Sequence, residues 1–145
     1  MMDPALAIQA VFFTALLAAA SFIDMQRRAI PDSICALIAL AGLITFSPAK
    51  LCGILAAAPL LIAAVCKEGS IGGGDIKLTA ASGFVLGIAG GAAGLVIGLS
   101  TMLLFHAGGK VRRLLRKGMP IHKTEATALP MAPFLSVGFA VVYFF

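Results

Sequence analysis

The chain has 145 residues, of which 61% are hydrophobic and 12% charged, and its mean hydropathy is +1.07. A soluble domain is usually about 45–50% apolar and about 25% charged. A globule of this size cannot hide so much apolar surface from water, so the composition excludes a water-soluble enzyme, a disordered tail and a disulfide-stapled secreted domain. We expect an all-α protein: a polytopic membrane helix bundle forming a single domain, residues 1–145.

The net charge of +5 comes from 11 basic and 6 acidic side chains. Most of the basic residues lie in short gaps between apolar runs, where they favour the cytoplasmic face and anionic lipids over nucleic acid. The three cysteines, Cys35, Cys52 and Cys66, all lie in apolar runs and have no metal-ligand spacing. We interpret them as small core residues, and we predict neither a metal site nor a disulfide.

Six apolar segments follow one another along the chain: residues 4–23, 33–46, 51–66, 76–86, 88–107 and 129–145. The first and the fifth have 20 residues, which is what a hydrocarbon core of about 30 Å requires. The other four are shorter and must be buried among neighbours, re-enter, or thin the bilayer. We expect residues 76–86 to fall short of a full crossing.

The basic residues test this topology. If all six segments cross, the inner gaps hold ten of the eleven basic residues, and only Lys50 lies outside. This requires a turn near Gly87–Gly91 and places the N-terminus outside. The first segment is not interpreted as a signal peptide, because Asp3 precedes it and Arg27 and Arg28 follow it, the reverse of a signal peptide's charge order.

Glycines recur every four residues in the fourth and fifth segments: Gly83 and Gly87, then Gly90, Gly94 and Gly98. Ridges of small residues let two helices approach closely. We favour packing within the chain over a homodimer seam, and a homodimer stays open.

The six acidic residues are few enough to consider one by one. Asp3 lies at the terminus, Asp32 follows Pro31 at a predicted helix start, and Glu68 and Glu125 lie in polar loops. These four have adequate structural explanations. A carboxylate beside an apolar run is costly in a membrane protein and marks a candidate functional site.

Asp24 and Asp75 are such carboxylates. Asp24 follows the first apolar segment and Asp75 opens the fourth, so the predicted topology places both at the cytoplasmic boundary. The structural alternatives are an ion pair of Asp24 with Arg27 or Arg28, and a helix N-cap or an ion pair with Lys77 for Asp75. Because both lie on one face and Asp75 follows three glycines, we favour a functional pair.

Two aspartates close together in a low dielectric do not both ionise easily, which leaves one acid and one base at neutral pH. The base can activate a water that attacks a peptide carbonyl, and the acid can protonate the carbonyl oxygen or the leaving amine. The two histidines, His106 and His122, are interpreted as structural. No Ser/His or Cys/His arrangement competes with the two aspartates.

Three glycines, Gly72, Gly73 and Gly74, precede Asp75. Without Cβ atoms, the backbone here can adopt strained angles and approach another chain, for example a substrate added as a strand. A flexible hinge explains the glycines equally well. A nucleotide-binding loop is excluded, because the Walker A spacing and a preceding strand are lacking.

The Gly-x-Gly-Asp-x-Lys stretch at residues 72–77 resembles the signature of type IV prepilin peptidases and archaeal preflagellin peptidases, which are intramembrane aspartic proteases. Asp24 with residues 30–32 resembles the motif of the family's first aspartate. Residues 77–87 and 129–135 resemble its continuation and its last helix. The resemblance extends over residues 21–135.

The resemblance implies that Asp24 and Asp75 are the catalytic pair, without a metal or an organic cofactor. Residues expected to bind substrate or shape the site are Gly72, Gly73, Gly74, Lys77, Pro31, Pro130 and Pro133. The implied reaction removes the short basic leader of a prepilin-like membrane protein, after a glycine and at the cytoplasmic face of the plasma membrane.

Many bacterial members carry an additional cytoplasmic region with paired CxxC motifs and also methylate the new N-terminus. This chain has no CxxC, so we expect a peptidase without N-methyltransferase activity, as in the short members linked to tight-adherence pili. Two alternatives remain. One is a channel or transporter that uses Asp24 and Asp75 for protons or cations. The other is a structural subunit whose basic loop binds a partner.

Overall fold

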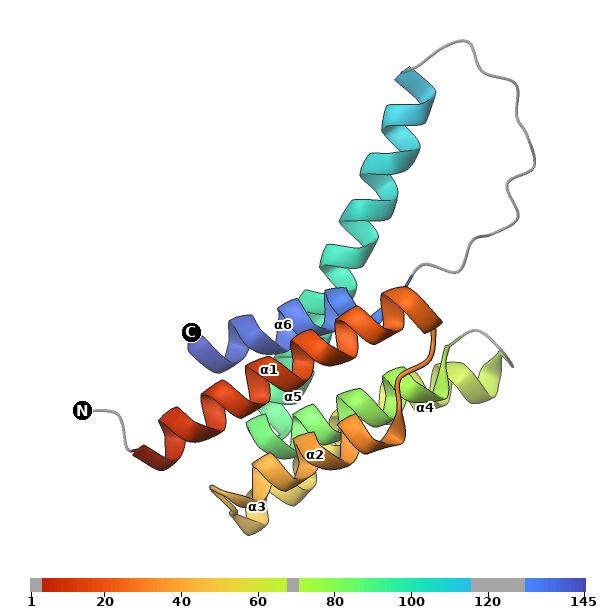
Figure 1. Cartoon of the computed structure of the whole chain (residues 1–145). Coiled ribbons are helices and arrows are strands. Elements are labelled where there is room, and N and C mark those ends of the chain that lie inside the picture. Colours follow the sequence, from red (N-terminus) through yellow and green to blue (C-terminus); the bar gives the residue numbers. More distant parts are fainter. Residues whose placement is uncertain (1–3, 68–70, 116–129) are drawn as a thin grey trace.

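The structure, a computed structural model, describes residues 4–67, 71–115 and 130–145, and every regular element in these ranges is helical. Figure 1 shows them in chain order: α1 (Pro4–Arg27), α2 (Asp32–Leu43), α3 (Pro48–Leu51), the 3₁₀ helix η1 (Cys52–Ala57), α4 (Ala58–Cys66), α5 (Gly73–Leu115) and α6 (Ala132–Phe144). The predicted all-α class is confirmed.

Within the described residues, three stretches are long and apolar enough to cross a bilayer: Pro4–Arg27, Pro48–Cys66 and Gly73–Arg112. The helices α2 and α6, with 12 and 13 residues, are apolar but shorter. These lengths fit a helical membrane protein. Six crossings and an outer N-terminus stay predictions.

The helix α5 is broken at Gly87, where φ is 79° and ψ is 173°. A Cβ atom added to Gly91 would lie 2.8 Å from the Cα atom of Gly83. In a continuous helix these positions are about 12 Å apart along the axis, so the chain folds back at Gly87. Glycine adopts this positive φ without a Cβ clash. The predicted turn between residues 76–86 and 88–107 is therefore present, and Figure 1 shows the two halves of α5 running in different directions.

The predicted glycine ridge packs within the chain. A Cβ atom on Gly94 would meet the ring of Phe139, and one on Gly98 would lie 2.9 Å from the Cα atom of Leu135, so the second half of α5 lies directly against α6. In the first half, Gly83 meets Gly53 of η1 backbone to backbone. These contacts favour the intramolecular interpretation of the glycines.

The segment predicted at residues 51–66 is not one regular helix, because it begins with α3 and continues through η1 into α4. Pro59 lies in the first turn of α4 and has no N–H with which to continue a helical ladder from the preceding residues. This loss accounts for the tighter 3₁₀ turns of η1 before it.

The core lies where α1, α2, α5 and α6 meet, and its fully buried side chains are Phe13, Leu17, Ile38, Leu78, Leu135 and Phe139. Many large apolar side chains face outward, among them Val11 and Leu103. A lipid-facing surface explains this. The prediction for cysteines was partly wrong: Cys35 is buried, but Cys52 and Cys66 are exposed, since they lie on the outer face of a bundle whose solvent is lipid.

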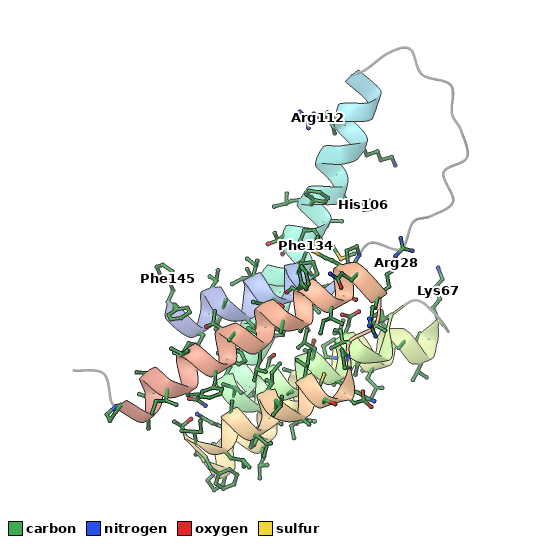
Figure 2. All side chains as sticks on the ribbon, viewed as in Figure 1. Arg28, Lys67, His106, Arg112, Phe134 and Phe145 are labelled. Carbon is green, nitrogen blue, oxygen red and sulfur yellow. The ribbon has the colours of Figure 1, made fainter. Side chains whose placement is uncertain are left out.

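The bundle has two distinct ends in Figure 1. We call the site end the one where α1 and α4 finish and where α2, α5 and α6 begin. We call the terminal end the opposite one, where α1 begins and α6 finishes. Figure 2 shows Arg28 and Lys67 at the site end, and Phe145 at the terminal end. The gathering of basic side chains at one end agrees with a cytoplasmic site end.

Candidate active site

Asp24 lies in the last turn of α1, because this helix continues to Arg27, four residues beyond the predicted apolar segment. Its side chain is only 6% exposed. The backbone N–H of Ala132, at the start of α6, donates a hydrogen bond of 3.1 Å to Oδ2 of Asp24. The positive end of a helix dipole therefore faces this carboxyl group.

The chain leaves α1 through Arg28, whose φ of 52° is in the left-handed region. The Arg28 N–H donates to the Asp24 carbonyl oxygen at 2.8 Å, which ends the helix as a C-cap residue does. This sharp exit lets residues 29–31 turn into α2. The exit also fixes Asp24 at the site end.

Asp75 lies in the first turn of α5, and its N–H donates to the Gly72 carbonyl oxygen at 3.1 Å. Its side chain is half-buried, and Oδ1 is a buried atom without a hydrogen-bond partner among the described residues. The charge of Asp24 acts on the Asp75 carboxyl group. The structure thus brings together two acidic residues that are 51 positions apart. Their catalytic role stays a prediction.

The structural alternatives for the two aspartates are not what the structure contains. Lys77 pairs with Asp32, with Nζ at 2.8 Å from both carboxylate oxygens, and not with Asp75. Asp75 lies two residues inside α5, so it is not the N-cap. Asp24 bonds to the backbone of α6, and among the described residues no ion pair involves it.

The three glycines before Asp75 differ from expectation in their backbone angles. None of them has a positive φ, so the prediction of strained angles was wrong: α5 begins at Gly73, and its first residues need no unusual conformation. A close approach within the chain is present at Gly74, where a Cβ atom would lie 3.0 Å from Cβ of Ile30. The approach of a substrate strand stays a prediction. Around Gly73 there is nothing within 4 Å, and a Cβ atom on Gly72 would lie 3.4 Å from Oδ2 of Asp75.

The three prolines named from the sequence lie at helix starts of the site end. Pro31 is the N-cap residue of α2, Pro133 lies in the first turn of α6, and Pro130 precedes α6 by two residues. Proline is favoured at a helix start because its missing N–H is not needed there. These residues therefore determine where α2 and α6 begin, close to Lys77–Asp32 and to Asp24 respectively.

Sequence reasoning missed two features of this site. One is Asp32, which was assigned only to a helix start; its opposite charge at the same end as Lys77 was the available signal. The other is the Ala132 N–H, because a backbone donor leaves no signal in residue type. No group of three His, Cys, Asp or Glu side chains within the described ranges could hold a metal ion.

The fold and the site together define a class: an all-helical membrane protein with two acidic side chains brought together at one end of its bundle. Residues 11–109, which include both aspartates, match the family model of the type IV leader peptidase family. The chain is 32% identical over 144 residues to the protein named prepilin leader peptidase/N-methyltransferase of Bacillus subtilis (strain 168). The chain therefore belongs to the type IV leader peptidase family.

The match to the Bacillus subtilis protein covers 94% of this chain and 55% of that relative, so the chain spans little more than half the relative's length. No solved structure matches this chain.

Proposed function

We propose that this chain is an intramembrane aspartic endopeptidase. Its substrates are prepilin-like membrane precursors, and it removes their basic leader after a glycine at the cytoplasmic face of the plasma membrane. The observation that carries the proposal is the pairing of Asp24 and Asp75 at the site end, near enough for one charge to act on the other. Family membership and the name of the Bacillus subtilis relative support the substrate class.

The contacts of the two carboxyl groups support a division of roles between them. Asp24 accepts a hydrogen bond from the N–H of Ala132 at the positive end of α6, so its carboxyl group has a backbone donor. Asp75 Oδ1 has no donor among the described residues, so Asp75 is the better place for a shared proton. Asp24 is then the general base and Asp75 the general acid.

In the first step, Asp24 takes a proton from water as the water oxygen bonds to the scissile carbonyl carbon, and Asp75 protonates the carbonyl oxygen. In the second step, Asp75 takes a proton back from the diol as the C–N bond breaks, and Asp24 gives its proton to the leaving amine. Both groups return to their starting state, and no other reactant is needed.

The depth of the site fits this substrate. Asp24 lies three residues before the end of a 24-residue apolar helix, and we infer from this length that it lies at the membrane boundary. The bond between a polar leader and a hydrophobic helix lies at the same depth. A precursor could therefore present this bond without moving its helix out of the bilayer.

The test is cleavage of a purified prepilin in liposomes that contain this protein. We expect Asp24→Asn and Asp75→Asn each to lower the cleavage rate at least about 100-fold, the scale of general acid–base catalysis. The control is Asp32→Asn, a carboxylate of the site end outside the pair, which should lose at most about threefold. Full activity in either variant of the pair would overturn the proposal.

The same liposomes test the alternatives. A channel or transporter predicts an ion flux that the two aspartate variants abolish, whereas the peptidase predicts no flux.

Mass spectrometry of the cleaved product, with a methyl donor present, tests the expectation of peptidase activity alone. An unmethylated N-terminus is expected, and a methylated one would correct this part of the proposal.

A further inference from the structure

A row of polar side chains extends from Asp75 into the bundle along α5. Asp75, Thr79 and Ser82 are spaced by four and three residues, which places them on one face of the helix. Thr79 and Ser82 are both 0% exposed. Asp75 Oδ1, Thr79 Oγ1 and Ser82 Oγ are buried atoms that have no hydrogen-bond partner among the described residues.

Four other helical hydroxyls do have hydrogen-bond partners. Thr14, Ser21 and Thr101 each donate to the carbonyl oxygen four residues earlier, at 2.7, 2.9 and 2.8 Å. The buried Ser136 also has partners, since it accepts from Ser21 at 2.8 Å and donates to the Leu17 carbonyl oxygen at 3.2 Å. Among the described residues, the buried hydroxyls without a hydrogen-bond partner are therefore confined to the row that begins at Asp75.

Leaving a buried hydroxyl without a partner is costly, and buried polar groups without a protein partner commonly bind water. Side chains three or four residues apart on a helix have Cβ atoms about 5–6 Å apart. The side-chain oxygen atoms extend from these Cβ atoms, and two hydrogen bonds of about 2.8 Å meet at an angle at a water, so a single water is within reach of both neighbours in the row.

We propose that Thr79 and Ser82 are a water-binding site: they hold water molecules in a line from the bundle interior to Asp75, which supplies the hydrolytic water. The supply role rests on the proposed function, whereas the binding of water does not. The neighbours Leu78 and Ala81 belong to the hydrophobic core, so the row lies inside the bundle and away from lipid. Water held in this row is ordered next to Asp75, so it is available for hydrolysis without being drawn from bulk water at the membrane boundary.

The first test removes one hydroxyl at a time while keeping the shape of the side chain as far as possible. We expect Thr79→Val and Ser82→Ala each to lower kcat for prepilin cleavage about tenfold, with KM unchanged, because substrate binding is not affected. Thr79→Ser keeps the hydroxyl and should restore kcat. The matched control is Thr101→Val on the same helix, whose hydroxyl bonds to the Ile97 carbonyl oxygen and which should not change kcat.

These outcomes separate the proposal from its competitors. An unchanged kcat in both variants overturns it. A raised KM with unchanged kcat would mean that the hydroxyls contact the peptide, and this also overturns it. The midpoint of thermal unfolding should change little in Thr79→Val, because the bound water leaves together with the hydroxyl that held it. A large fall would indicate a hydrogen bond to the protein itself and would overturn the proposal.

A second test needs no activity. Radiolysis of bound water oxidises the side chains next to it, so we expect oxidation within residues 78–86 of the wild-type protein in liposomes. The equally buried Phe13 should stay unmodified. The oxidation should disappear in the Thr79→Val/Ser82→Ala double variant. If residues 78–86 of the wild-type protein are not oxidised, water binding is overturned. If they are oxidised but the protein cleaves no prepilin, water binding stands, and the proposed function and the supply role are overturned.

Discussion

The two ends of the bundle both contain buried polar side chains, but only towards the site end are some of them left without a hydrogen-bond partner among the described residues. At the terminal end, Gln9 is 1% exposed, and its Nε2 donates to the Ala41 carbonyl oxygen at 2.9 Å. Its Oε1 accepts from the hydroxyl groups of Thr45 at 2.9 Å and Tyr143 at 3.4 Å. Lys50 then donates to Thr45 at 2.8 Å. These hydrogen bonds connect α1 with α2, with the loop and helix α3 that follow it, and with α6.

At the site end, in contrast, the polar groups of α5 are left without partners: Asp75 Oδ1 and, deeper in the bundle, Thr79 and Ser82. A fully satisfied network makes a low-dielectric interior rigid, while an unsatisfied group lowers stability. The terminal end therefore holds the bundle together. The unpaired groups towards the site end lower stability, and we propose that they bind water instead.

The largest effect that tests this contrast is on stability at the terminal end. Gln9→Ala leaves the Ala41 carbonyl oxygen without the Gln9 amide and the Thr45 hydroxyl without its acceptor, so we expect a loss of about 2 kcal/mol in the free energy of unfolding. Cleavage by the folded fraction should stay within about twofold of wild type. Unfolding in mild detergent, followed by circular dichroism, measures the free energy of unfolding. A cleavage assay measures the rate of the folded fraction.

The matched variant at the other end is Asp75→Asn, which should abolish cleavage without lowering stability, since it removes a carboxyl group that lacks a donor. If Gln9→Ala stopped cleavage while the protein stayed folded, or Asp75→Asn unfolded the protein, the division of roles between the two ends would be wrong.

The contrast also explains what the sequence could predict. Long apolar runs predicted the helical class. The order of basic residues predicted the turn near Gly87–Gly91 within α5. Composition and charge decide these features directly. The pair Asp24 and Asp75 was identified because a carboxylate beside an apolar run is rare and costly. Their location at one end followed from the topology.

The rest depends on contacts that residue types do not encode. The Ala132 N–H that bonds to Asp24 is a backbone group, and the partners of Gln9 come from elements 32 to 134 positions away. In the sequence, Thr79 and Ser82 are hydroxyl residues in an apolar helix, as Thr14 and Thr101 are. Only the packed structure shows that the hydroxyls of Thr14 and Thr101 bond to their own helix and that those of Thr79 and Ser82 do not. The glycines before Asp75 were misassigned in part for the same reason, since the contact of Gly74 is with Ile30.

The second prediction concerns these glycines and has a smaller effect. Gly74→Val should lower the cleavage rate about tenfold, because its Cβ atom would lie 3.0 Å from Ile30 and the branched side chain would displace residues 29–31 or the first turn of α5. Gly73→Val is the matched control, because space around Gly73 is open, and it should stay within about threefold of wild type. Equal rates for the two variants would contradict the close approach at Gly74.

The smallest effect is expected at the pair Lys77–Asp32, which joins the starts of α5 and α2 at the site end. Both side chains are more than half exposed, so the pair contributes at most about 1 kcal/mol to stability. We expect Lys77→Ala to lower the cleavage rate about threefold, because the start of α5 that carries Asp75 is held less firmly. Increasing salt should lower the wild-type cleavage rate toward that of Lys77→Ala, because salt screens an exposed ion pair. Cleavage kinetics at several salt concentrations measure this.

A charge exchange decides whether this pair positions α5 or only adds charge to the site end. Asp32→Lys combined with Lys77→Asp keeps the pair and reverses its direction, so the double variant should recover most of the rate that Lys77→Asp alone loses. No recovery would mean that Lys77 acts on the substrate itself. In that case Lys77 would be a cationic group that contacts the peptide, and the groups that bind substrate would include one at the exposed edge of the site.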